Sequence, residues 1–151
     1  MAEYTSNDVQ QVALNNPILF TASIPCPNGN VYHADETGIF ILKGKASAPN
    51  RFARYQVTFN GNIAVTEGGT VTPIAVSLAV NGEPKLTSRA IITPAAAENF
   101  GNVTSTTIID VPAGCCFSVS VRYVSGSNDP TVTPTPVIDV QNANLEIVRT
   151  A

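Results

Sequence analysis

The chain has 151 residues and a mass of 15.8 kDa, which fits one domain with a single hydrophobic core. Apolar residues make up 44% of it and charged residues 13%, a composition that excludes a disordered chain and a solvated helical bundle. The net charge of -3 offers no basic surface for nucleic acid, so we expect no nucleic-acid partner. With one His and three Cys, we expect neither an enzyme nor a bound cofactor.

The first fourteen residues contain no Lys or Arg and no apolar run, so they lack both parts of a secretory signal. No stretch approaches the ~20 apolar residues of a membrane span. We therefore expect a chain that first folds in the cytoplasm and has no membrane partner. Residues 1–14 are polar except for a short stripe of Val9, Val12 and Leu14, which predicts an N-terminal attachment arm ahead of a domain over 15–151.

Val, Thr and Ile are abundant while Leu is scarce, a bias typical of pleated sheets. Residues 54–60, 73–80, 117–123 and 145–147 alternate apolar and polar side chains with period two, as half-buried strands do. Further strands are predicted over 18–24, 39–43, 62–66, 86–92, 103–111 and 137–141. About eight to ten short antiparallel strands predict an all-β sandwich or barrel.

Turn residues separate these strands. The turns are predicted at 27–30, 60–62, 67–69, 81–84, 112–114 and 125–128, and an extended loop is predicted over 129–136. One connection has helical features: Thr93 fits an N-cap, Pro94 the first helical position and Gly101 the end. That segment predicts either two turns of helix or a plain loop.

Candidate sites for chemistry are sparse. His33 and Asp35 would share a face of a strand, but a metal site needs further ligands that the sequence does not place nearby, so we read the His33–Glu36 cluster as a polar loop. The dispersed aspartates leave a calcium site in the loops open; they are Asp8, Asp35, Asp110, Asp129 and Asp139. No nucleophile elbow accompanies the single His, and nothing selects a pair of carboxylates for glycoside hydrolysis.

The three cysteines do not form a secreted disulfide framework, and two of them, Cys115 and Cys116, are adjacent. We interpret Cys115 and Cys116 as buried reduced thiols. A bridge from Cys26 to Cys115 or to Cys116 stays open.

The apolar rows of the best strands are the candidate core or oligomer-interface residues, because an alternating row predicts a buried face but not what covers it. These residues are Tyr55, Val57, Phe59, Phe117, Val119, Val121, Tyr123, Leu145 and Ile147. The second sheet face, rich in Ala, Ser, Thr and Asn, is neither a good core nor a well-solvated surface. Such a face favours association between identical copies.

Three strings in order carry a family resemblance: residues 55–59, residues 74–84 ending in Val80-Asn81-Gly82-Glu83-Pro84, and residues 143–148, with Pro112-Ala113-Gly114 before the strand of Phe117. Together they resemble the globular heads that unite complement-type heads, tumour-necrosis-factor-like ligands and the C-terminal domains of spore-surface collagen-like glycoproteins. The resemblance implies a jelly-roll β-sandwich that assembles as a homotrimer. It also implies that the strands of Tyr55, Phe117 and Leu145 approach the threefold axis in one sheet.

The chain is also similar to short proteins of gut bacteria and their prophages, whose ends resemble residues 140–145. Both resemblances lead us to expect a non-enzymatic structural protein of a phage particle: a trimeric head fibre, a capsid decoration or a tail-associated knob, assembled in the host cytoplasm. Its arm would bind other virion proteins, and its loops would meet a host glycan or receptor. The alternative is an adhesion module on a bacterial cell or spore surface.

Overall fold

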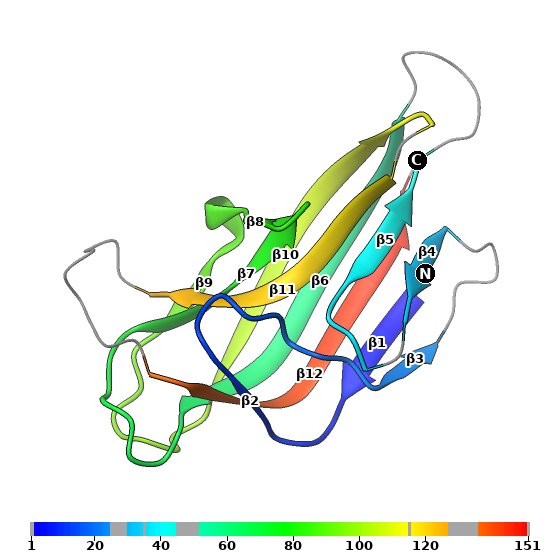
Figure 1. Cartoon of the computed structure of the whole chain (residues 1–151). Coiled ribbons are helices and arrows are strands. Elements are labelled where there is room, and N and C mark those ends of the chain that lie inside the picture. The colour runs from blue at the N-terminus through cyan, green and yellow to red at the C-terminus, as the bar shows by residue number, and fades with distance from the viewer. Residues whose placement is uncertain are drawn as a thin grey trace.

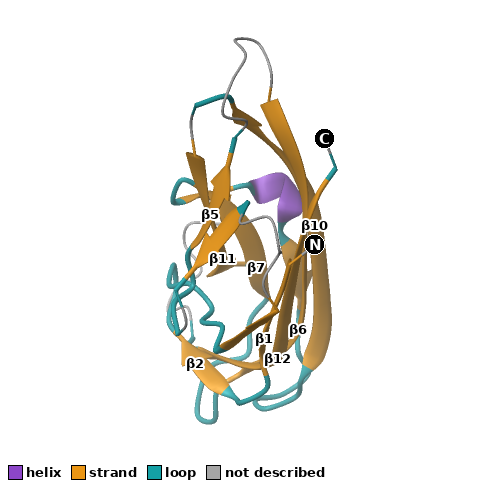
Figure 2. Ribbon diagram, turned by 90° about the vertical axis from the view of Figure 1, so that its right-hand side faces the viewer, coloured by secondary structure: helices purple, strands orange, loops and turns teal. Residues whose placement is uncertain are grey.

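The protein is a sandwich of two antiparallel sheets, seen face-on in Figure 1 and edge-on in Figure 2. The computed structural model describes residues 2–24, 30–34, 36–44, 52–114, 116–126 and 136–150. Their apolar side chains point between the sheets into one core, as period-two patterning requires. The prediction of an all-β jelly-roll sandwich is confirmed.

Sheet A has the strand order β10-β6-β12-β1-β3, with the short β2 also paired to β12. Its long central strands bury one side chain in two, so each contributes an apolar row to the core. The strands are β1 (Ala2–Ser6), β2 (Gln10–Val12), β3 (Ala22–Ile24), β6 (Phe52–Val65), β10 (Gly101–Pro112) and β12 (Ile138–Arg149).

Sheet B has the order β4-β5-β11-β7-β8, with β9 also paired to β7. A short 3-10 turn, η1 (Leu86–Ser88), interrupts the edge of this sheet between β8 and β9. The strands are β4 (Val31–His33), β5 (Phe40–Lys43), β7 (Ile74–Val80), β8 (Glu83–Pro84), β9 (Ala90–Ile92) and β11 (Cys116–Ser125).

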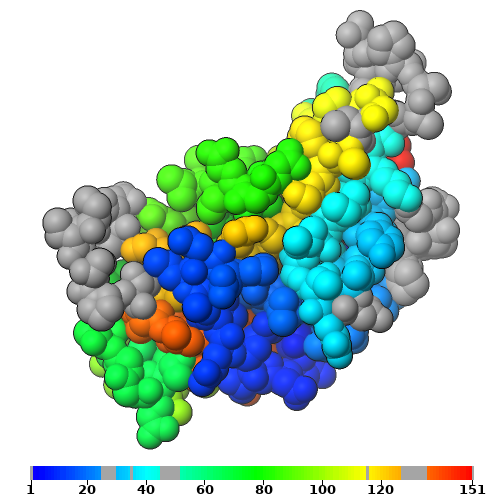
Figure 3. All heavy atoms as spheres, in the orientation of Figure 1, coloured from blue at the N-terminus to red at the C-terminus, as the bar shows by residue number. Residues whose placement is uncertain are grey.

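The segment between β2 and β3 crosses over to sheet B and continues its ladder. Ile18 N donates to Val121 O at 2.8 Å, and Asn15 N donates to Tyr123 O at 2.8 Å. In Figure 3 this blue segment lies beside the orange end of β11 in the middle of the visible face. The two sheets are therefore tied together by the N-terminal part of the chain.

Residues 1–14 are not set apart from the domain as predicted, because β1 and β2 are built into sheet A. β1 pairs with β12 on one side and with β3 on the other, and Ala2 and Tyr4 are buried. The Tyr4 ring packs on Phe40 of sheet B with centroids 4.5 Å apart. The buried residues of this strand alternate at positions 2, 4 and 6 and are small or aromatic. The prediction of an arm rested only on the apolar stripe that begins at Val9.

One local prediction fails, and one open alternative is decided. The turn expected at 60–62 is the middle of β6, where ladders to β10 and β12 on both sides hold the Asn-Gly-Asn segment extended. The irregularity lies instead in β12, between Gln141 and Asn144, where Asn142 has a φ of 54°. Of the two alternatives for residues 93–101, the structure has the loop: Glu98 has a φ of 63°, and its N–H donates to Val65 O at 2.8 Å.

Most of the other predicted strands are present with shifted ends. The segments 137–141 and 145–147 are one strand, β12, while 86–92 divides into η1 and β9. The turns at 67–69, 81–84 and 112–114 lie between strands as predicted. The turn at 27–30 and the loop at 129–136 fall almost wholly outside the described residues.

Candidate interaction surface

The predicted apolar rows face the core of the subunit. Tyr55, Val57 and Phe59 on β6 and Leu145 and Ile147 on β12 line the sheet A side, while Val119, Val121 and Tyr123 on β11 line the sheet B side. All of them are almost completely buried. Phe117 is half-buried at the start of β11. These side chains therefore stabilise the sandwich itself, and a partner must meet the reverse side of the strands.

The strand of Phe117 does not share a sheet with those of Tyr55 and Leu145, contrary to the implied arrangement. β11 lies in sheet B between β5 and β7, whereas β6 and β12 are neighbours in sheet A. The three strands look alike in sequence because both sheets use the same alternation. A surface on sheet A can thus include the reverse side of β6 and β12 only.

The hydroxyls of two buried tyrosines donate hydrogen bonds to backbone carbonyl oxygens at the ends of the sandwich. Tyr55 Oη donates to Lys43 O at 2.5 Å, and Tyr123 Oη donates to Pro136 O at 2.7 Å. Burial raises the pKa of Tyr123 to about 12. Both hydroxyls act as anchors of the fold.

The stripe predicted to form an arm is divided by the fold. Val12 is buried in β2, while Val9 is 53% exposed and Leu14 37% exposed in the adjoining turns. Gln10 fixes this region by a paired contact with the backbone of Leu19, with both distances 2.9 Å. The stripe therefore packs partly on its own domain.

The outer face of sheet A is a broad surface of short, mostly uncharged polar side chains. Asn102 Nδ2 donates to Asn60 Oδ1 at 2.8 Å, Thr104 Oγ1 donates to the same oxygen at 3.1 Å, and the Thr58 and Thr106 hydroxyls lie 3.2 Å apart. These cross-strand bonds hold the side chains flat against the sheet. By register and exposure the face comprises Glu3, Thr5, Arg54, Gln56, Thr58, Asn60, Asn62, Asn102, Thr104, Thr106, Ile108, Asp110, Asn144, Glu146 and Val148.

This face also carries charged side chains, among them Glu146 on the middle strand β12. Arg54 Nε donates to Asp110 Oδ1 at 2.8 Å, a hydrogen bond that lowers the pKa of the Asp110 carboxyl and raises that of Arg54. The pair is exposed, so it contributes little to stability. Glu3 and Glu146 stand directly opposite each other on β1 and β12, and Glu3 Oε1 accepts a bond from Asn144 Nδ2 at 2.6 Å.

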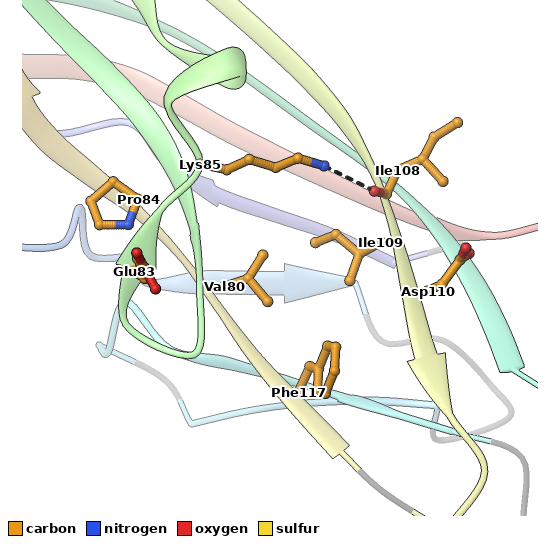
Figure 4. Close-up of a pocket in the computed structure, with 8 residues that line it drawn as sticks. All are labelled: Val80, Glu83, Pro84, Lys85, Ile108, Ile109, Asp110 and Phe117. Carbon is orange, nitrogen blue, oxygen red and sulfur yellow. Dashed lines mark hydrogen bonds between the residues drawn. The ribbon is translucent and has the colours of Figure 1, made fainter.

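A groove of about 380 Å³, which we call the edge groove, opens where the edges of the two sheets meet at β8 and β10. Figure 4 shows Val80, Ile109 and Phe117 around it, with Glu83 and Asp110 on opposite sides. Lys85 spans it and donates from Nζ to Thr107 Oγ1 at 2.7 Å and to Ile108 O at 3.3 Å. Sequence reasoning missed this groove, because its walls come from opposite sheets and share no periodic signal.

The cluster read as a polar loop is an aromatic contact in the part of it that the structure describes. His33 stacks on Phe40 with centroids 4.3 Å apart, meets the edge of Tyr4, and holds Thr37 O at 2.9 Å through Nε2. Asp35 lies outside the described residues. His33 therefore packs on the core, whereas the sequence predicted that it lies in a polar loop.

The described aspartates have local roles or lie apart. Asp139 accepts a hydrogen bond from Thr66 at 3.2 Å, and Asp110 is paired with Arg54. Within the described ranges, no three His, Cys, Asp or Glu side chains gather closely enough to hold a metal ion. Asp129, Cys26 and Cys115 fall outside those ranges. Cys116 is exposed, unlike the buried thiol that was expected.

Across the described ranges, none of the helical structure has the length and apolar character that a membrane crossing requires.

Solved structures share this fold, although no family model matches the chain and no curated protein matches it. The globular domain of zebrafish complement 1qA protein is similar with a TM-score of 0.57 and 14% identity, over 95% of this chain and 92% of that one. The structure of Eiger TNF from S. frugiperda is similar with a TM-score of 0.61 and 13% identity, over 100% of this chain and 92% of that one. The chain therefore has the jelly-roll fold that complement-type globular heads and tumour-necrosis-factor-like ligands share.

Proposed function

We propose that this protein is a non-enzymatic structural and binding module that works as a homotrimer, with the outer face of sheet A turned toward the other subunits. The observation that carries the proposal is the set of hydrogen bonds between Thr and Asn side chains on that face. Asn60, Thr58, Thr104 and Thr106 bond to one another across β6 and β10, and none of these four side chains is charged. Charged side chains are depleted at the core of protein interfaces, so this part of the face is suited to lie there.

The energetics of such a face favour burial against a copy of itself. Thr and Asn side chains are short and already held by cross-strand hydrogen bonds, so ordering them on association costs little rotamer entropy. Groups that are already hydrogen-bonded also lose less when water leaves. A permanent assembly needs a subunit contact on the order of 800 Å² per partner, which the face of a six-stranded sheet can supply.

The shape of the sandwich permits a cyclic arrangement, which agrees with the sequence resemblance to trimeric heads. Sheet A has two different edges, β10 and β3, so one edge of a copy can meet the next copy in a head-to-tail contact. A contact of this kind closes into a ring when the rotation between copies is a whole fraction of a turn. The proposed ring has three members.

Charged substitutions on two exposed threonines test this proposal. Thr106→Arg places a cation on the outer face of sheet A, halfway along β10, and Thr70→Arg makes the same chemical change in the loop after β6. Sedimentation velocity should show that Thr106→Arg lowers the trimer fraction while Thr70→Arg leaves it unchanged. Equal trimer fractions for both variants would exclude this face as the interface.

The finer proposal is a structural role in a phage particle, as a head fibre, a decoration or a tail-associated knob. Its support is the resemblance of residues 140–145 to the ends of short prophage proteins. Mass spectrometry of particles purified after prophage induction should detect peptides of this chain at a constant ratio to the major capsid protein. If the peptides are missing from particles and antibodies label the intact producing cell instead, the protein is a surface adhesion module.

A further inference from the structure

The edge groove and the opposite margin of sheet A have complementary shapes and charges. The groove is lined by the apolar side chains of Val80, Ile109 and Phe117, and Lys85 crosses it with its ammonium group at the edge of β10. At the other margin, Ile24 on β3 is 64% exposed, and it stands in register with Glu3. One margin therefore offers a hollow with a cation, and the other offers an apolar side chain beside an anion.

Two carboxylates inward of Ile24, Glu3 on β1 and Glu146 on the middle strand β12, are poorly arranged for an isolated subunit. Glu3 and Glu146 are directly opposite each other on neighbouring antiparallel strands, a placement in which like charges destabilise a sheet. Asn144 donates one hydrogen bond to Glu3, but an amide does not neutralise a carboxylate. A cation supplied by a second copy would relieve this repulsion.

The register of sheet A places both features at the same level along the strands. One row runs across the sheet through Thr106, Thr58, Glu146, Glu3 and Ile24. Lys85 bonds to Thr107 and Ile108, the next residues on β10, so its ammonium lies close to that row. A rotation about an axis parallel to the strands keeps every row at its own level, so these features of neighbouring copies would lie at the same level.

We propose that the edge groove receives a second copy of this chain, with Ile24 of the neighbour seated over Val80, Ile109 and Phe117 and with Lys85 paired to the neighbour's Glu146 and Glu3. The proposal rests on the homotrimer proposed above and names the residues that close it. The contact is heterologous, because the edge groove lies at one edge of sheet A and Ile24 at the other. Each subunit therefore uses its groove once and its Ile24 once. The charge pairing also fixes the order of the copies around the ring.

A charge swap tests the pairing. Lys85→Glu and Glu146→Lys should each raise the trimer dissociation constant about tenfold or more, because each places like charges against each other at three contacts. The double variant, with both reversals, should return most of the lost affinity. Lys85→Gln keeps hydrogen-bond donors toward Thr107 and Ile108 but removes the charge, and it should show an intermediate dissociation constant with a weaker dependence on salt.

A matched control separates this contact from general charge effects. Glu67→Lys in the loop after β6 makes the same reversal as Glu146→Lys at an exposed position outside both sites, and it should leave the dissociation constant unchanged. Circular dichroism confirms that each variant is folded. A wild-type trimer that Lys85→Glu and Glu146→Lys leave intact, or a double variant no tighter than the singles, would overturn the pairing alone. A wild-type monomer would overturn both the pairing and the homotrimer.

Discussion

Tyr4 and Phe40 lie with ring centroids 4.5 Å apart, so the first strand of the chain is fastened to the opposite sheet. The backbone of Tyr4 is also held between β12 and β3, in register with Leu145 and Ser23. The N-terminus is thus part of the core. The core-facing side of this strand is therefore not available to another protein, whereas Glu3 and Thr5 lie on its other side.

Removal of the Tyr4 ring tests this integration. Tyr4→Ala leaves a cavity against Phe40 and His33 and should lower the free energy of unfolding by about 3–5 kcal/mol. Urea unfolding followed by circular dichroism measures the change. Val9→Ala, at an exposed position of the same segment, should change it by less than about 0.5 kcal/mol. A Tyr4 variant as stable as wild type would restore the interpretation of the segment as a free arm.

The two faces of sheet A should respond differently to truncation. Leu145 is fully buried on the core side of β12, so Leu145→Ala should cost about 2–5 kcal/mol of stability. Gln56 is exposed on the outer face, so Gln56→Ala should leave the unfolding free energy of the subunit nearly unchanged. Thermal unfolding of both variants at one protein concentration gives the comparison. Equal losses would mean that the register of sheet A is wrong.

Gly38 should be irreplaceable for steric reasons. A Cβ there would lie 2.6 Å from Ile18 O and 2.7 Å from Pro17 Cβ, so Gly38→Ala must displace backbone and should cost about 1–3 kcal/mol. Gly68→Ala is the control, because its Cβ would meet nothing within 4 Å and only its φ of +80° is unfavourable, at about 1 kcal/mol. Urea midpoints compare them. A Gly38 variant less affected than the Gly68 variant contradicts the close contact.

Alkaline stability should depend on Tyr123. Its folded-state pKa is raised from 10.0 to about 12, so the folded state holds this proton more tightly than the unfolded state does. The resulting stabilisation is complete below pH 10 and is lost as the pH rises from 10 to about 12. Absorbance of tyrosinate should therefore show one late-ionising group that Tyr123→Phe removes. Identical titration curves for variant and wild type would contradict the burial of this phenol.

Strand content and the core rows could be predicted because alternation reports directly on a buried face. Tyr55, Val57 and Phe59 alternate with Arg54, Gln56 and Thr58, and the structure buries the first set and exposes the second. The same alternation does not say which sheet a strand joins. The rows of Phe117 and Leu145 look alike, yet β11 and β12 lie in different sheets.

The failures come from long-range pairing that local patterns do not contain. Asn60-Gly61-Asn62 has the residues of a turn, but β10 and β12 on either side keep it extended. The edge groove joins Lys85 of one sheet edge to Ile108 of another, and these residues have no shared period. The outer face of sheet A could be predicted in part, because the abundance of neutral Thr and Asn residues is a property of composition.

The mass of the unmodified chain in solution tests the central claim, that identical copies cover the outer face of sheet A. Sedimentation velocity over a range of concentrations should give a species with three times the 15.8 kDa subunit mass that persists on dilution. A single species with the mass of one subunit at every concentration would contradict the account.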